Sequence, residues 1–338
     1  MSWQAKLLIF LMKFSAKPAL GVISMSAFSM RVLRFLFAAL ASILPVPKFV
    51  AIEKVNVDGV PAEWVSAGNQ TATGIANDKV ILYFHGGGYF CGSPKTHRPI
   101  TWRLARNTGM KVLAIDYRMS PEFSIPISML DAISSYRWLL QQGYKAHNIT
   151  LGGDSAGGNL TLITTLEIRN QALPMPAAIF CISPFADLTA TSPSLIYNAK
   201  SEALIHHKGL RKIQQKLCNK LDSYDPQISP VYADYHNFPP IFLQVGSTEV
   251  LLDDSNRVAE RARQAGVLVV QKVWINMPHV FTILADFMPE GKRGLREIAE
   301  FIIDYTGYRA VNKETAEDGL SVDHLPIDRL LPEHVVIN

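Results

Sequence analysis

Short apolar runs alternate with longer amphipathic stretches from about residue 50 onward. The apolar runs are rich in β-branched and aromatic residues, which is typical of buried strands; they cover 80–84, 111–117, 148–153, 177–183, 240–247 and 267–274. The stretches between them show helical spacing of apolar residues or end at a glycine, as helices do; they cover 98–109, 128–143, 253–266 and 295–305. Strands that are apolar throughout and alternate with helices predict an α/β fold, with a mostly parallel central sheet and helices on both faces.

The first 48 residues follow a different pattern, in which basic residues interrupt apolar segments. Segment 7–12 is apolar but closes at Lys13, and two uncharged runs, 18–30 and 35–47, are separated by two arginines. A membrane-spanning helix needs about 20 apolar residues, so none of these segments is long enough, and 7–12 is also short for a signal peptide. The pattern predicts one or two amphipathic helices that cover their own domain; contact with a membrane surface stays open as the alternative.

The region 184–239 lacks strong strands and contains a helix-like stretch at 201–221. It is too long for a plain loop, so we predict a helical cap inserted at about 190–235. The predicted organisation is N-terminal cap helices in 1–48, an α/β domain in 49–308 that carries this insertion, and a polar, loosely packed tail in 309–338.

Composition narrows the function classes. Of the 338 residues, 48% are hydrophobic and 18% are charged, as in a globular protein. The formal net charge of +4 is small and Lys and Arg are scattered, so nothing predicts a nucleic-acid partner. The three cysteines, Cys91, Cys181 and Cys218, lie far apart without C-x-x-C spacing. We therefore expect no disulfide framework, no metal and no cofactor, and a reducing, cytoplasmic location.

A glycine-flanked serine lies where a predicted strand gives way to an apolar, helix-like stretch. Residues 153–157 read Gly-Asp-Ser-Ala-Gly, which fits G-x-S-x-G. A nucleophile on a sharp strand-to-helix turn crowds the residues two positions away on either side, and glycine removes the side chains that would clash. The alternative is a plain glycine-rich turn, because so short a motif also arises by chance. The motif makes Ser155 a candidate nucleophile.

A second glycine cluster supports Ser155 as the nucleophile. Residues 85–89, His-Gly-Gly-Gly-Tyr, directly follow a predicted strand. Acyl transfer creates an oxyanion, whose stabilisation needs backbone N–H donors that no side chain obstructs. Gly87, Gly88 and Ala156 are the candidate donors. A phosphate-binding loop is disfavoured because no Lys-Ser/Thr pair follows either glycine cluster.

The base and the acid are sought among the loops that follow later strands. His279 comes just after the last predicted strand, where a loop can return to the serine. Glu249 comes directly after another predicted strand, and Ser155, Glu249 and His279 obey the order serine, acid, histidine. Asp253 is the alternative acid, although it and Asp254 also fit the N-cap of a helix.

Several long motifs together resemble the hormone-sensitive-lipase-like family of α/β-hydrolases, which are carboxylesterases and lipases. The resemblance covers roughly 80–280 and rests on H-G-G-G-Y at 85–89, D-Y-R-M-S-P-E at 116–122, G-D-S-A-G-G-N at 153–159, S-P-F-A-D-L at 183–188 and P-H-V-F at 278–281. It implies an α/β-hydrolase fold with Ser155 as nucleophile, His279 as base, and an oxyanion hole from Gly87, Gly88 and Ala156. The family usually has an aspartate where this chain has Glu249.

Five charged or polar residues near these motifs are assigned supporting roles, because clusters of this kind are most often structural hydrogen-bond networks. They are His85, Asp116, Arg118, Glu122 and Asp154. We expect His85 to tie its own glycine loop in place, and Asp116, Arg118 and Glu122 to support the same loop.

The sequence thus predicts a carboxylic ester hydrolase with a Ser-His-Glu triad and an acyl-enzyme intermediate. Its partner would be a small-molecule ester with a short- to medium-length acyl chain, held in an apolar pocket under the cap. An amidase or acyltransferase with the same triad is the nearer alternative, and a non-catalytic ligand-binding protein on the same fold is the more distant one. The oligomeric state is not predicted.

Overall fold

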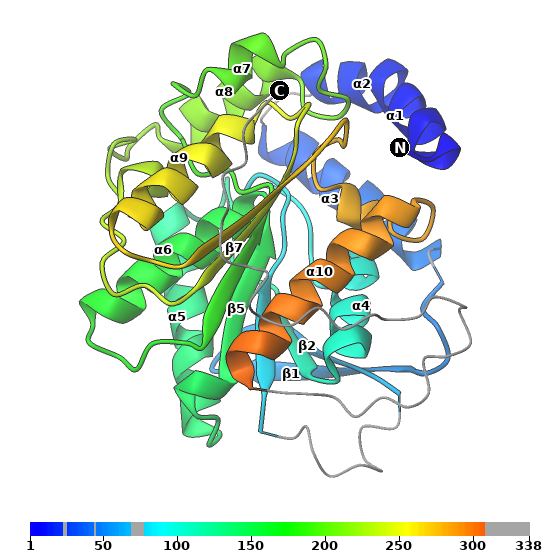
Figure 1. The fold of residues 1–338 in the computed structure, drawn as a ribbon. Coiled ribbons are helices and arrows are strands. Elements are labelled where there is room, and N and C mark those ends of the chain that lie inside the picture. The colour runs from blue at the N-terminus through cyan, green and yellow to red at the C-terminus, as the bar shows by residue number, and fades with distance from the viewer. Residues whose placement is uncertain (23–25, 44, 69–77, 308–338) are drawn as a thin grey trace, which may run out of the picture. The chain divides into compact units, whose positions relative to one another are not determined.

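The computed structural model describes residues 1–22, 26–43, 45–68 and 78–307, and within them the strands form one eight-stranded sheet (Figure 1). The strands are β1 (Val50–Val57), β2 (Val60–Ala67), β3 (Val80–Phe84), β4 (Lys111–Ile115), β5 (Ile149–Asp154), β6 (Ala178–Ile182), β7 (Ile241–Gly246) and β8 (Val269–Trp274). They lie in the order β1-β2-β4-β3-β5-β6-β7-β8. The β1–β2 and β2–β4 pairs are antiparallel and the other pairs are parallel, so the predicted mostly parallel sheet is confirmed.

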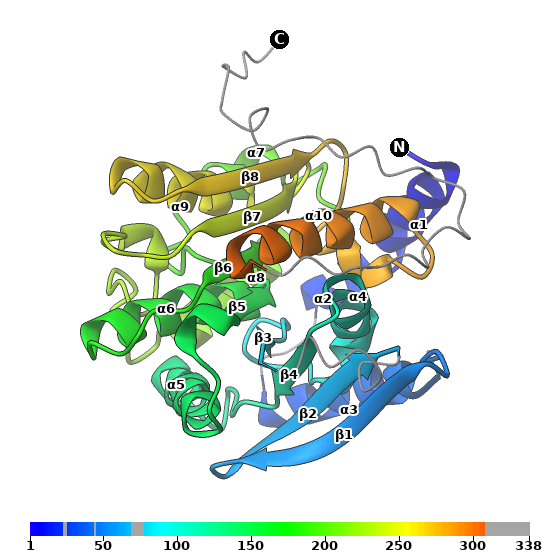
Figure 2. The same ribbon diagram turned by 60° about the horizontal axis from the view of Figure 1, so that its bottom comes forward.

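Helices cover both faces of this sheet, as Figure 2 shows. One face carries α4 (Arg98–Thr108) and α10 (Pro289–Thr306), and the other carries α5 (Ile125–Gln141), α6 (Ala156–Asn170) and α9 (Leu252–Gln264). Because both faces are covered, every residue of β3 and β5 is buried, which explains why these strands are apolar or glycine-rich along almost their whole length.

The sequence pattern does not predict the hairpin of β1 and β2. β1 lies at the sheet edge, where Glu53 and Lys54 are exposed, so it is not apolar throughout. The turn between the strands is Asp58-Gly59, and both residues have positive φ, 49° and 90°. An Asp-Gly pair between strands is the usual composition of such a two-residue turn, and it is the signal that could have found the hairpin.

Three helices, rather than the predicted one or two, occupy the described part of the N-terminal segment. They are α1 (Trp3–Phe14), α2 (Ala16–Val22) and α3 (Ala27–Ile43). The hydroxyl of Ser2 accepts from the Ala5 N–H at the start of α1 and donates to Glu290 of α10, which ties α1 to the domain. No helix within the described ranges combines the length and apolar character that crossing a membrane requires.

The region predicted as a cap insertion contains two short helices, α7 (Ser194–Tyr197) and α8 (His207–Leu217). They lie with α1 and α2 at the top of Figure 1, beyond the ends of the parallel strands. Short 3₁₀ helices complete the described elements, at Lys95–His97, Ala146–Asn148, Pro230–Tyr232 and Phe281–Leu284. The predicted tail, 309–338, lies outside the described residues.

The three cysteines are free thiols. Cys91 and Cys181 are buried and Cys218, at the end of α8, is half-buried. Burial raises the pKa of Cys91 to about 12 and that of Cys218 to about 11, and it also raises the pKa of Cys181.

Candidate active site

Ser155 stands on the turn between β5 and α6, with φ 52° and ψ −115°. A backbone in this region costs about 1–3 kcal/mol for a residue with a side chain, so the surroundings must hold it. Its N–H donates to Ile182 O at 2.8 Å. A Cβ atom on Gly153 or Gly157 would overlap Phe84 O, so both motif glycines are required by close backbone approach.

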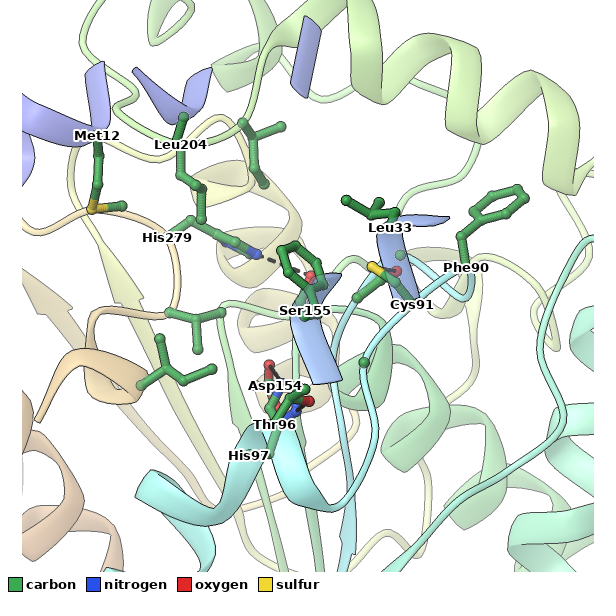
Figure 3. Close-up of a pocket in the computed structure, with 18 of the residues that line it drawn as sticks. Met12, Leu33, Phe90, Cys91, Thr96, His97, Asp154, Ser155, Leu204 and His279 are labelled. Atoms are coloured by element: carbon green, nitrogen blue, oxygen red, sulfur yellow. Dashed lines mark hydrogen bonds and ion pairs between the residues drawn. The ribbon is translucent and has the colours of Figure 1, made fainter. Parts of the chain in front are cut away.

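The structure brings the serine, the histidine and the glutamate of the predicted triad together. Ser155 Oγ lies 3.0 Å from His279 Nε2, the contact drawn as a dashed line in Figure 3. His279 Nδ1 lies 2.8 Å from Glu249 Oε2. All three side chains are buried, although they come from the loops that follow β5, β7 and β8.

Glu249 is held by donors on its second oxygen. Its Oε1 accepts from the Ser183 hydroxyl at 2.7 Å and from the Gly246 N–H at 2.5 Å. The Ser183 oxygen in turn accepts from the Val280 N–H at 3.2 Å, one residue beyond His279. The carboxylate that faces His279 is therefore fixed from both its own loop and the histidine loop.

Asp253, the alternative acid, lies elsewhere. Its carboxylate accepts from the Ser194 N–H at 2.8 Å and from the Tyr197 hydroxyl at 2.9 Å, both in the α7 region. The predicted N-cap role is wrong for Asp253 and Asp254, because Leu251 occupies the N-cap position and both aspartates lie within the first turn of α9.

The glycine loop after β3 presents backbone N–H groups beside Ser155. Gly87 has φ 118° and Gly88 has φ 65°, and a Cβ atom on Gly87 would overlap Cys91 O. Within the described ranges, the N–H groups of Gly87 and Gly88 donate to no protein acceptor. Ala156 is the first residue of α6, where a backbone N–H has no intrahelical acceptor. The three predicted oxyanion donors are therefore available next to the serine.

Comparison with known proteins identifies the family of this chain. Residues 81–283 match the model of a family described as having the α/β hydrolase fold. An esterase of Acinetobacter venetianus is 37% identical over 270 residues, which are 80% of this chain and 87% of that protein. An acetyl-hydrolase of Streptomyces hygroscopicus is 36% identical over 253 residues, 75% of this chain and 83% of that protein. A crystal structure of an esterase from the bacterial hormone-sensitive lipase family superposes with a TM-score of 0.83 at 36% identity, over 91% of this chain and 99% of that one. The chain belongs to the hormone-sensitive-lipase-like family of α/β-hydrolases.

This hormone-sensitive-lipase-like hydrolase is therefore a carboxylesterase-type enzyme, as predicted, and carboxylic ester hydrolysis is its chemistry. Among the described residues, no group of three or more His, Cys, Asp or Glu side chains is arranged to hold a metal ion.

Asp154 of this hydrolase links the nucleophile turn to the glycine loop. Its carboxylate accepts from the Tyr83 hydroxyl at 2.5 Å and from the Gly86 N–H at 3.0 Å, and it pairs with His97 Nε2 at 3.2 Å. Burial alone would raise the pKa of Asp154, but His97 and the hydrogen bonds lower it overall. His97 is buried and also lines the pocket that contains Ser155, and its residue type alone gave no signal of its bond to Asp154.

His85 ties its own loop, in agreement with the expectation. Its Nδ1 lies 2.8 Å from Gly86 O, and its ring stacks on Tyr117 at 4.4 Å between centroids. Burial and the nearby His97 lower the pKa of His85 to about 3, so the ring is neutral and Nδ1–H is the donor. Asp116 Oδ1 lies 3.8 Å from His85 Nε2, which is beyond hydrogen-bond distance.

The expected role of Arg118 as a support of the glycine loop is wrong. Among the described residues, its guanidinium forms no hydrogen bond to the loop and pairs instead with Asp131 of α5 at 2.6 Å. Glu122 reaches the loop only indirectly. It pairs with Arg34 of α3 at 3.0 Å, and Arg34 Nε donates to Phe90 O at 2.7 Å.

Glu202, in the cap region, is a buried carboxylate that sequence reasoning missed. It is fully buried, and Oε2 accepts from the Val250 N–H at 3.1 Å, next to Glu249. Oε1 accepts from the Leu204 N–H at 2.9 Å. Lys17 of α2 donates to Glu202 O at 2.7 Å. The cap segment is thereby attached both to the acid loop and to an N-terminal helix.

The charges around His279 shift its pKa. Burial lowers the pKa of this imidazole, but the hydrogen bond and charge of Glu249 raise it, as do the charges of Glu202 and Asp154. The net pKa lies above the usual value for histidine. Glu202 itself has a raised pKa because burial and the nearby Glu249 both disfavour its charged form.

A cavity of about 660 Å³ opens over Ser155 (Figure 3). Its wall combines residues of the N-terminal helices, the glycine loop and the cap. The apolar side chains in it include Met12, Met30, Leu33, Phe37, Leu204 and Ile213. The site is therefore an apolar chamber with the serine, the histidine and the glycine loop at its polar end.

Proposed function

We propose that this protein hydrolyses short- to medium-chain acyl esters through Ser155, His279 and Glu249, with an acyl-enzyme intermediate. The observation that carries the proposal is the continuous hydrogen-bond chain from Ser155 Oγ through His279 to Glu249. A serine activated in this way, next to unobstructed backbone donors, is equipped for acyl transfer.

In the proposed mechanism, neutral His279 accepts the Ser155 proton at Nε2 while Oγ attacks the acyl carbon. The N–H groups of Gly87, Gly88 and Ala156 stabilise the oxyanion. The imidazolium then protonates the leaving alcohol, which departs and leaves the acyl-enzyme. Water repeats the sequence and releases the acid. Glu249 keeps the proton on Nδ1 and stabilises the imidazolium.

The volume and apolar wall of the cavity support small or medium acyl groups. Small-molecule sites usually occupy about 300–1,000 Å³, and 660 Å³ lies within that range. The names of two relatives also support small acyl groups. One is called an acetyl-hydrolase, and the structure of another, at 34% identity, was determined after soaking with p-nitrophenyl butyrate.

A series of p-nitrophenyl esters, from acetate to palmitate, tests the proposal. We expect kcat/KM to peak at a short or medium chain, because longer chains exceed the chamber. Leu33→Trp should narrow the chamber and lower kcat/KM for the longest accepted chain by about tenfold or more, as one methylene in such a pocket is worth about 1–3 kcal/mol. Leu268→Trp, at an exposed position, is the matched control.

A peak on palmitate or on emulsified triglyceride would contradict the chain-length proposal. Cleavage of anilides but not of esters would instead favour the amidase alternative, and acyl transfer to an added alcohol in place of hydrolysis would favour the acyltransferase.

The pH dependence of kcat/KM should report the protonation of His279. Because the general base must be neutral, kcat/KM should fall as the pH drops through the raised pKa of His279. Glu202→Gln removes one of the negative charges that raise this pKa, so the acid limb should move to lower pH. Glu53→Gln, at an exposed position on β1, should leave the limb unchanged. If the acid limb of Glu202→Gln lies at the same pH as that of the wild type, the charge of Glu202 does not act on His279.

A further inference from the structure

α1 exposes a stripe of large apolar side chains. Trp3, Leu7, Phe10, Leu11 and Phe14 are all exposed, and Trp3 is 70% exposed. Their spacing, i, i+4, i+7, i+8 and i+11, places them on one face of the helix. A single exposed apolar residue is ordinary, but an aromatic-rich stripe along a whole helix indicates a contact surface.

α3 repeats the same arrangement. Phe28, Val32, Phe35 and Leu36 are exposed, with Phe28 at 76% and Phe35 at 72%, and their spacing is again i, i+4, i+7 and i+8. We call the exposed apolar residues of α1 and α3 the outer stripes. α1 and α3 are among the blue helices in Figure 1.

The opposite face of each helix points toward the interior of the protein. Met12 of α1 and Met30, Leu33 and Phe37 of α3 line the cavity. The outer stripes are therefore not needed to cover the cavity, and both point away from it. Packing among the residues that the structure describes does not account for their aromatic character.

Charge identifies the partner that fits these stripes. The first 52 residues contain Lys6, Lys13, Lys17, Arg31, Arg34 and Lys48, and no Asp or Glu. Lys6 and Lys13 are exposed and lie beside the α1 stripe at helical spacing. Arg31 and Arg34 pair with Glu122, and Lys17 donates to backbone carbonyls of the cap, so Lys6 and Lys13 are the exposed cations beside the α1 stripe. Apolar and aromatic side chains flanked by such lysines match the surface of an anionic bilayer.

We propose that α1 and α3 dock this protein on the surface of an anionic phospholipid bilayer, with the outer stripes inserted at the level of the headgroups and the flanking lysines against the phosphates. The helices lie on the membrane, since none described here can span it. The proposal does not depend on the hydrolytic mechanism.

Vesicle co-sedimentation of the full chain tests the docking. We expect binding to vesicles of phosphatidylcholine mixed with phosphatidylglycerol, weaker binding to phosphatidylcholine alone, and loss of binding strength as salt is added. Lys6→Gln/Lys13→Gln should weaken binding to the mixed vesicles by about thirtyfold, from the contribution of two basic residues near an anionic surface. Lys145→Gln/Lys220→Gln, also at exposed positions, should bind like the wild type.

The outer stripes are tested separately. Phe28→Ser/Phe35→Ser should weaken binding at least about tenfold, because it removes the inserted apolar surface. The matched control is Ile196→Ser/Ile275→Ser, at positions that are 71% and 70% exposed elsewhere on the chain. Circular dichroism and thermal melting of each variant verify that it is folded.

Three results would overturn the proposal. The first is failure of the wild-type chain to bind mixed vesicles at low salt. The second is equal binding by the phenylalanine and isoleucine variants. The third is a wild-type dimer that Phe28→Ser/Phe35→Ser converts to a monomer in sedimentation velocity without any effect on vesicle binding, which would make the outer stripes an interface between two copies.

Discussion

Ser155→Ala should lower kcat on p-nitrophenyl butyrate by about four to six orders of magnitude without unfolding the protein. Alanine cannot attack the acyl carbon, and the oxyanion donors and the cavity, which remain, supply only residual catalysis. The backbone at 155 already carries a side chain at φ 52°, so alanine adds no strain. The measurement is steady-state kinetics on purified protein, with thermal melting as the check on folding.

A matched control and a labelling experiment sharpen this test. Ser255 is also buried but lies on α9, and its hydroxyl has no partner within the described residues. Ser255→Ala should therefore retain wild-type turnover. A fluorophosphonate probe should label the wild type and Ser255→Ala but not Ser155→Ala. Retained hydrolysis by pure Ser155→Ala would show that Ser155 is not the nucleophile. If the probe does not label the wild type, a ligand-binding protein is favoured.

Glu249→Gln should lower kcat by about ten-thousandfold. The carboxylate accepts from His279 on one oxygen and from Ser183 and Gly246 on the other. A glutamine has one acceptor oxygen and one donor NH₂ group, so it cannot satisfy both sides. Where the NH₂ group faces His279, the imidazole carries its proton on Nε2 and can no longer accept the proton of Ser155.

Asp253→Asn is the control for the acid. Asp253 contacts Ser194 and Tyr197 rather than the histidine, so its substitution should change kcat by only a few-fold. Both variants are compared at a pH above the acid limb of the wild type. A larger loss in Asp253→Asn than in Glu249→Gln, in folded proteins, would reverse the assignment.

The elements whose apolar residues are buried in a regular pattern could be predicted from the sequence. β3 and β5 are buried on both faces, so their composition identifies them as strands, and the glycines around Ser155 are required by close backbone contact with Phe84. The β1–β2 hairpin was missed because a half-exposed edge strand is not apolar throughout.

Side-chain partners across long sequence distances could not be predicted in the same way. Arg118 belongs to the family-like motif at 116–122, yet its partner is Asp131 of α5. Glu202 lies between regular elements, and only the folded chain brings it to the acid loop. The type of residue limits what a side chain can bond to, but the direction in which it leaves the backbone decides which partner it meets.

The state of the native thiols has a practical consequence for fluorescence work. Thiols react with maleimides and iodoacetamides as thiolates, and burial keeps Cys91, Cys181 and Cys218 protonated at neutral pH. A fluorophore could therefore be attached at one chosen surface position without first removing native cysteines. Phe28→Cys offers such a position because residue 28 is 76% exposed. An environment-sensitive dye there would change its emission on entering lipid.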